Sequence, residues 1–364
     1  MQLIAAVYDE KRTQAIKMAV RAGGAALAER SSLDPFWSFL RALFLNLAIV
    51  VMIGFPSIVP SLAESCIVVD SDADLDDFRA VITLAPTGQL AAIVITEGIA
   101  RAHEGAGAME NLLSHAGLVV PVIVGASADR ERQYTPDKNL PAWRRAAEQL
   151  NGILTNPISP SIQTDGDFVR TLRRLTAKCS TVSLLVIGPW TSFLRYADDL
   201  LPKVDRITVQ GRPYPDEPGG EPAGFNCVYD IEPCRTSFDL LTGRQLRADR
   251  RLRVNWVDIP NGAESCGSAE PGVDGSGKRL FAFRPTDQWI HDLQGAGKAA
   301  GAVAEVLNAN RDSWQQTSLW DDLAALFLLR PEIFGRRGGH FEPCVPAATV
   351  RNLLTEAMSR TLAK

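Results

Sequence analysis

The sequence predicts an α/β fold in which a mostly parallel sheet has helices on both faces. Short apolar runs alternate with segments of helical periodicity, and acidic residues follow the first apolar run, where such sheets bind their ligands. The chain has 364 residues, of which 46% are hydrophobic and 22% are charged, so it can build a large core. Its net charge of -4 and its lack of a long basic run argue against nucleic acid as a partner.

The predicted elements follow one another in strand–helix alternation. Apolar runs predict strands at residues 67–69, 91–96, 119–125, 182–187, 206–210 and 253–257. Helical patterns predict helices at residues 76–83, 104–116, 165–178, 192–201, 232–241 and 314–329. Two further segments, 213–224 and 261–277, are expected to be surface loops.

The N-terminal region does not share this alternation. No charged residue occurs between Ala42 and Ala63, and residues 42–55 are strongly apolar. Because Ser61-Leu62-Ala63 resembles a small-x-small cleavage site, we expect residues 1–63 to be a signal peptide of a periplasmic or secreted protein, removed before Glu64. Two alternatives stay open. Residues 42–63 could anchor the chain in a membrane, since about 20 apolar residues span a bilayer, or they could form a core helix.

The cysteine content is compatible with export. An even number of cysteines permits disulfides in an oxidising compartment, and buried free thiols are the alternative. No pair has the spacing of a zinc site. The six residues are Cys66, Cys179, Cys227, Cys234, Cys266 and Cys344.

An acidic segment directly follows the first predicted strand. Asp70, Asp72, Asp74, Asp76 and Asp77 fall within eight residues. Like charges this close repel one another and stay ionised together only beside a positive charge. Oxygen ligands favour Ca²⁺ or Mg²⁺ over zinc, so the segment predicts a site for a hard cation. The alternative is a solvated acidic turn that caps the following helix.

This segment has the pattern Asp-x-Asp-x-x-x-Asp-Asp, which resembles the signature of the inosine-uridine nucleoside hydrolase family. Other family motifs are similar, in the same order, to residues 92–98 (Ala-Ile-Val-Ile-Thr-Glu-Gly), 188–192 (Gly-Pro-Trp-Thr-Ser), 224–232 (Gly-Phe-Asn-Cys-Val-Tyr-Asp-Ile-Glu) and 320–324 (Trp-Asp-Asp-Leu-Ala). The resemblance extends from about residue 66 to 334. It implies that residues 64–364 form a catalytic domain with the Rossmann-like nucleoside hydrolase fold, which acts as a homo-oligomer in nucleoside catabolism and salvage.

The resemblance also implies a reaction and a metal site. The reaction is calcium-dependent hydrolysis of the N-glycosidic bond of a purine or pyrimidine ribonucleoside, giving ribose and free base. Ca²⁺ would be held by Asp72, Asp77, Asp321 and the main-chain oxygen of Ile187. Asp72 would also be the base that takes a proton from a metal-bound water, whose pKa the metal lowers.

The contacts to substrate are expected to differ from the family pattern. By resemblance, Asp76 and Asn226 would bind the sugar. However, Ile99 replaces a family asparagine, Gly224 replaces a glutamate that contacts the 5′-hydroxyl, and Trp320 replaces a histidine linked to protonation of the leaving group. Trp320 could stack on the base or simply line the pocket wall. A non-catalytic nucleoside- or sugar-binding protein on the same fold is therefore the second hypothesis.

Overall fold

The computed structural model describes residues 64–128, 138–162, 167–213, 224–246, 252–259, 283–311 and 317–360. The predicted signal peptide or anchor at residues 1–63 and the predicted loop at residues 261–277 lie outside these ranges, as does most of the predicted loop at residues 213–224. Within the described ranges, no helix is long and apolar enough to cross a membrane.

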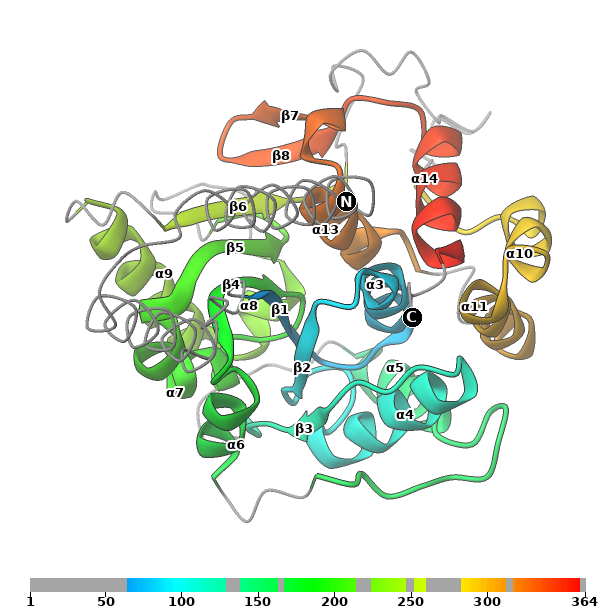
Figure 1. The fold of residues 1–364 in the computed structure, drawn as a ribbon, viewed down its shortest axis with the longest axis horizontal. Helices are drawn as coiled ribbons and strands as arrows, with labels where there is room; N and C mark the ends of the chain where they lie inside the picture. The colour runs from blue at the N-terminus through cyan, green and yellow to red at the C-terminus, as the bar shows by residue number, and fades with distance from the viewer. Residues whose placement is uncertain are drawn as a thin grey trace, which may run out of the picture. The chain divides into compact units, whose positions relative to one another are not determined.

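An eight-stranded sheet forms the centre of the described domain (Figure 1). Its strand order is β3-β2-β1-β4-β5-β6-β8-β7, and every pairing is parallel except that of β7 with β8. The mostly parallel sheet and all six predicted strands are confirmed. The strands are β1 (Glu64–Ser71), β2 (Leu90–Ile95), β3 (Val122–Val124), β4 (Cys179–Val186), β5 (Val204–Gln210), β6 (Arg253–Val257), β7 (Phe334–Arg337) and β8 (His340–Pro343).

Helices cover both faces of this sheet, as the alternating pattern predicts. A larger hydrophobic cluster joins one face to α3 (Leu75–Leu84), α4 (Ala102–His115), α5 (Leu140–Gln149), α10 (Asp287–Gln294), α11 (Lys298–Ala309), α13 (Trp320–Leu329) and α14 (Ala347–Ser359). A smaller cluster joins the other face to α6 (Phe168–Leu175), α7 (Thr191–Leu200) and α9 (Ile231–Leu246), and the short α8 (Phe225–Tyr229) precedes α9. Figure 1 shows the two groups of helices on opposite sides of the sheet.

The central strand β1 shows why the sheet is buried on both faces. Ile67 and Val69 belong to the larger cluster, whereas Cys66 and Val68 belong to the smaller one. Successive side chains of a strand point to opposite faces, so both faces of β1 must be apolar. The polarity changes at Asp70, near the end of the strand, and the functional residues begin there.

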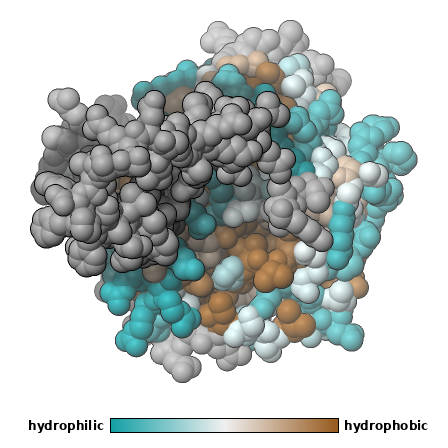
Figure 2. Space-filling view, in the orientation of Figure 1, coloured by the Kyte–Doolittle hydropathy of each residue, from teal (hydrophilic) through white to brown (hydrophobic). Residues whose placement is uncertain are grey.

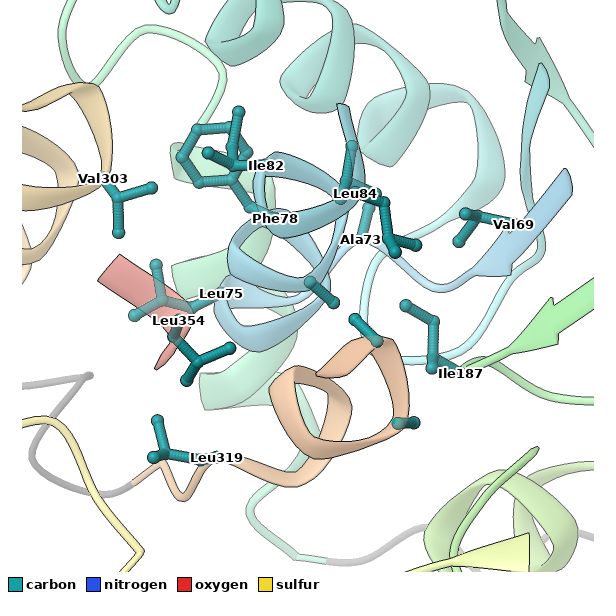
Figure 3. Close-up of a cluster of buried hydrophobic side chains, with 14 of the residues drawn as sticks. Val69, Ala73, Leu75, Phe78, Ile82, Leu84, Ile187, Val303, Leu319 and Leu354 are labelled. Carbon is teal, nitrogen blue, oxygen red and sulfur yellow. The ribbon is translucent and has the colours of Figure 1, made fainter. Parts of the chain in front are cut away.

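The helix that follows β1 is enclosed by other elements. Every residue of α3 is buried, and Figure 3 shows Phe78 and Ile82 close to Val303 of α11, with Leu75 facing Leu354 of α14. The first turn of α3 lies beside α13 in the same view. This packing holds the N-terminal ends of α3 and α13, which both begin with acidic residues, close together.

Between pairs of described cysteines, two disulfides join elements of the domain. Cys66 of β1 is bonded to Cys179 of β4, and Cys227 of α8 is bonded to Cys234 of α9. For these four cysteines the disulfide alternative is confirmed and the free-thiol alternative is wrong. The second bond fixes α8, which lies at the carboxyl-terminal edge of the sheet, to the longer helix α9.

On the coloured part of the face that Figure 2 shows, several apolar residues gather near and below the centre of the view, among polar residues. Among the described residues, the large apolar side chains with high exposure are Val119, Ile158 and Val228. They lie far apart in the sequence, on different elements or loops.

Candidate active site

The carboxyl-terminal ends of β1, β2 and β4 meet at one edge of the sheet. The amide of Thr96 donates to the carbonyl of Ser71 at 2.8 Å, and the amide of Gly188 donates to the carbonyl of Asp70 at 3.1 Å. Between β1 and α3 the backbone of Ala73 is left-handed, with φ of 57°. Such a conformation is unusual for a residue with a side chain and often marks a functional turn. Acidic side chains gather on this turn.

Asp72 lies in the turn and is held on two sides. One carboxylate oxygen, Oδ2, accepts a hydrogen bond from the amide of Ile99 at 2.8 Å. The amide of Asp72 donates to Oδ1 of Asp77 at 3.1 Å. Gly98 leaves no room for a side chain, since an added Cβ would lie 2.2 Å from Oδ2 of Asp72. The backbone of Ile99, and not its side chain, thus supplies the contact that orients Asp72.

Asp76, Asp77 and Asp321 converge from two helices. Each can place one carboxylate oxygen within 4.8 Å of the oxygens of the other two, and all three side chains are buried. Burial raises the pKa of each, and like charges on neighbouring aspartates add to the shift for Asp76 and Asp321. Asp72 is close enough to Asp77 for the same repulsion to raise its pKa, after the larger effect of burial.

This donor set fits a hard divalent cation. All three side chains of the group offer carboxylate oxygens, which Ca²⁺ and Mg²⁺ prefer, and no His or Cys belongs to the group. Buried carboxylates that repel one another are costly to ionise, and a cation among them removes that cost. The geometric group contains Asp76, to which the family resemblance assigns sugar binding, together with the expected ligands Asp77 and Asp321.

Ile187 and Asn226 meet on the other side of this edge. The side-chain amide of Asn226 donates to the carbonyl of Ile187 at 2.7 Å and to Oε1 of Gln210 at 3.3 Å. A carbonyl oxygen has two lone pairs, so that of Ile187 can accept this bond and still face a cation. Gly188 allows the close approach of the two loops, because an added Cβ would lie 2.8 Å from the amide nitrogen of Asp72.

A buried polar network lies beneath the acidic group. Asp70 accepts hydrogen bonds from Thr96 at 2.5 Å and from the Tyr196 hydroxyl at 2.7 Å. Burial raises the pKa of Asp70 to about 7, although both hydrogen bonds act in the opposite direction. Ser192 extends the network, since its hydroxyl lies 2.6 Å from that of Thr96 and accepts a hydrogen bond from the amide of Ala126. Sequence reasoning missed Tyr196, which no motif marks.

A second group of polar residues, also missed from the sequence, holds the turn after β2. Arg144 of α5 donates to the carbonyls of Gly98 and Ile99 at 2.7 and 2.9 Å, and to the Tyr229 hydroxyl at 2.7 Å. Tyr229 in turn donates to the buried carboxylate of Glu97 at 3.0 Å. The same turn provides the amide that binds Asp72, so Arg144 supports Asp72 indirectly.

Trp320 occupies the first position of α13, directly before Asp321. It is partly exposed and packs against the larger hydrophobic cluster. Its position at the acidic group is compatible both with stacking on a substrate and with lining the pocket wall. The helix predicted at residues 314–329 is α13, which begins later than predicted, at Trp320; residues 314–316 lie outside the described residues.

Comparison with protein-family models and with curated proteins finds no match. Solved structures do match. The purine-preferring ribonucleoside hydrolase from Gardnerella vaginalis has a TM-score of 0.57 at 14% identity, over 81% of this chain and 98% of its own. An inosine-guanosine nucleoside hydrolase has a TM-score of 0.56 at 14% identity, over 81% of this chain and 99% of its own. The inosine-uridine preferring nucleoside hydrolase from Bacillus anthracis has a TM-score of 0.51 at 13% identity, over 82% of this chain and 100% of its own. The chain has the nucleoside hydrolase fold, as its motifs predict.

Proposed function

We propose that the chain hydrolyses the N-glycosidic bond of a ribonucleoside and that it requires Ca²⁺. The observation that supports this most strongly is the buried group of Asp76, Asp77 and Asp321 beside Asp72, at the ligand-binding edge of this fold. The family resemblance of the motifs supports the same substrate class, as do the similar structures, which are purine-preferring, inosine-uridine preferring and inosine-guanosine nucleoside hydrolases.

Asp72, Asp77, Asp321 and the carbonyl of Ile187 would hold the cation. When bound, it would lower the pKa of a water molecule near the sugar and bind sugar hydroxyls. Asp72 would take the proton from that water, since the amide of Ile99 fixes the position of its Oδ2.

Asp76 and Asn226 would bind the ribose. Breaking the ribosyl C–N bond develops positive charge on the sugar ring, as in O-glycoside hydrolysis. Nearby carboxylates stabilise that charge, so Asp76 has a role in the transition state as well as in binding. No nucleophilic Ser or Cys is required. Trp320 would stack on the departing base and ease its release.

A non-catalytic nucleoside- or sugar-binding protein is the second candidate. The observation that favours it is the thinner set of side chains around the acidic group. Ile99 contributes only its backbone to Asp72, and Gly224 has open space where a side chain would reach. Such a protein would use the same cation and ribose contacts without turnover.

We further propose that the protein acts in the periplasm or outside the cell, as a homo-oligomer. The disulfides Cys66–Cys179 and Cys227–Cys234 support an oxidising compartment. Anchoring by residues 42–63 is the alternative to cleavage of a signal peptide. N-terminal sequencing of the exported protein tests this, because cleavage predicts a chain that begins near Glu64.

The experiment that tests the function is a screen of purine and pyrimidine nucleosides for release of free ribose, with Ca²⁺ and with a chelator. We expect release only with Ca²⁺, and loss of release in Asp321→Asn. Gly243→Ala is a matched control, because that residue lies in α9 and has open space around it. Calcium-dependent nucleoside binding in calorimetry without any ribose release would contradict hydrolysis and establish the binding alternative.

A further inference from the structure

A fully buried ion pair joins the two helices that provide the acidic group. The guanidinium of Arg79, on α3, donates from Nη2 to Oδ2 of Asp322 at 2.7 Å and from Nε to both carboxylate oxygens at 3.1 Å. Both side chains have no exposed surface. Nη2 also donates to the carbonyl of Ser318, just before α13, at 2.8 Å. Sequence reasoning identified neither partner of this pair.

The pair is directly adjacent to the proposed ligands on both helices. Arg79 follows Asp76 by three residues, which places the two side chains on neighbouring turns of one helix face. Asp322 follows Asp321 in the first turn of α13. The guanidinium attracts the carboxylates of Asp76 and Asp321 as well as that of Asp322. The pair therefore crosses the same helix interface that brings the acidic group together.

We propose that Arg79 and Asp322 are a positioning pair for the cation site. The pair sets the distance between the first turns of α3 and α13, and Asp322 keeps the guanidinium away from the carboxylates that bind the cation. This inference rests on the proposed cation-dependent function and adds two residues to it. Neither residue touches the cation or the substrate.

Three physical reasons support this assignment. A buried ion pair is often no more stabilising than an apolar pair of similar volume, so fold stability alone is a weak reason for it. The planar guanidinium binds a carboxylate with two parallel hydrogen bonds, which fixes direction as well as distance. Arg also stays charged at all relevant pH values, so without Asp322 it would turn to Asp76 or Asp321 and compete with the cation.

The test is calorimetric titration of Ca²⁺ into chelator-treated full-length protein, compared with the Asp322→Asn variant. We expect Asp322→Asn to weaken calcium binding about 10- to 100-fold, the usual effect of losing an outer partner of a metal ligand. Asp258→Asn is the control, because Asp258 also accepts a hydrogen bond from an arginine, Arg212, at 3.0 Å. It should lower the thermal midpoint in chelator and leave calcium affinity unchanged.

The calcium affinity of the variants distinguishes a positioning pair from a purely structural one. If folded Asp322→Asn binds calcium as tightly as the unmutated chain, the pair is only structural and the inference is wrong. If Asp322→Asn does not fold, the double variant Arg79→Met with Asp322→Leu removes both buried charges, and the same weakening is expected of it. Unchanged affinity in that variant overturns the inference. An unmutated chain that binds no calcium refutes the proposed function itself, and this inference with it.

Discussion

Replacement of Gly98 by alanine should displace the carboxylate of Asp72. The added Cβ would lie 2.2 Å from Oδ2, 2.7 Å from Cβ and 2.8 Å from Cγ of Asp72. Non-bonded carbon atoms prefer about 3.5–4.0 Å, so the carboxylate or the turn must move by roughly 1 Å. The hydrogen bond from the Ile99 amide to Asp72 would lengthen or break with it. A misplacement of about 1 Å at a catalytic group can lower turnover about 10²-fold.

The assay is steady-state hydrolysis of a nucleoside and of a nitrophenyl riboside at saturating Ca²⁺. Gly98→Ala should lower kcat on both substrates by about 10²-fold. Its backbone does not need the left-handed region, so the variant should fold, with a thermal midpoint lowered by the overpacking of the buried turn. Gly243→Ala introduces the same methyl group into open space and should keep full activity. Equal turnover by Gly98→Ala and Gly243→Ala would refute the view that the position of the Asp72 carboxylate limits the reaction.

Four further outcomes are expected. At saturating Ca²⁺, Asp72→Asn should keep the fold and most ligand binding yet lose turnover by about 10²- to 10⁴-fold, the usual contribution of a general base; retained kcat would exclude Asp72 as the base. Trp320→Ala should reduce kcat for purine nucleosides more than for a nitrophenyl riboside, and equal losses would remove Trp320 from leaving-group chemistry. Because burial raises the pKa of Asp70 to about 7, the folded, cation-free protein binds a proton that the unfolded chain has released, and the contribution of Asp70 to stability should be lost as pH rises from about 4 to 7. Thermal scans of the cation-free protein should show a midpoint that falls over this range, whereas a constant midpoint would contradict it. Replacing both Cys66 and Cys179 by serine should lower the free energy of unfolding by about 2–5 kcal/mol, measured in denaturant.

The sheet was predictable from the sequence where its strands are buried on both faces. Residues 67–69 are a continuous apolar run, residues 182–187 are apolar except for Ser183, as a central parallel strand requires, and both segments lie almost entirely in strands of the structure. The hairpin of β7 and β8 was not predicted. Its sequences, Phe-Gly-Arg-Arg and His-Phe-Glu-Pro, lie at the edge of the sheet and have no apolar run. Edge strands are short and polar, so periodicity alone does not detect them.

The acidic part of the site was predictable for a different reason. Asp72, Asp76 and Asp77 lie close together in the chain, and repulsion within such a group indicates a functional role without knowledge of the fold. Arg79 and Asp322 are 243 positions apart, and each alone resembles an ordinary charged residue of a helix. Only packing of α3 against α13 shows that they are buried and paired. Interactions between distant elements leave no local pattern, which is also why Arg144 was missed.

The electrostatics of the site separate the two functional hypotheses better than its list of residues does. A buried group of like charges opposes folding, and a cation among Asp76, Asp77 and Asp321 would remove that cost. That argument applies equally to a cation-dependent binding protein. Asp72 differs, because Gly98 and the Ile99 amide fix the direction of its carboxylate, and Arg144 holds that turn in place. A cation-dependent binding protein and a hydrolase both need Asp72 as a ligand, whereas only a hydrolase needs it as a base. Gly98→Ala retains the charge and changes the orientation, so turnover that is lost at saturating Ca²⁺, with the cation still bound, would show that the orientation of Asp72 limits hydrolysis.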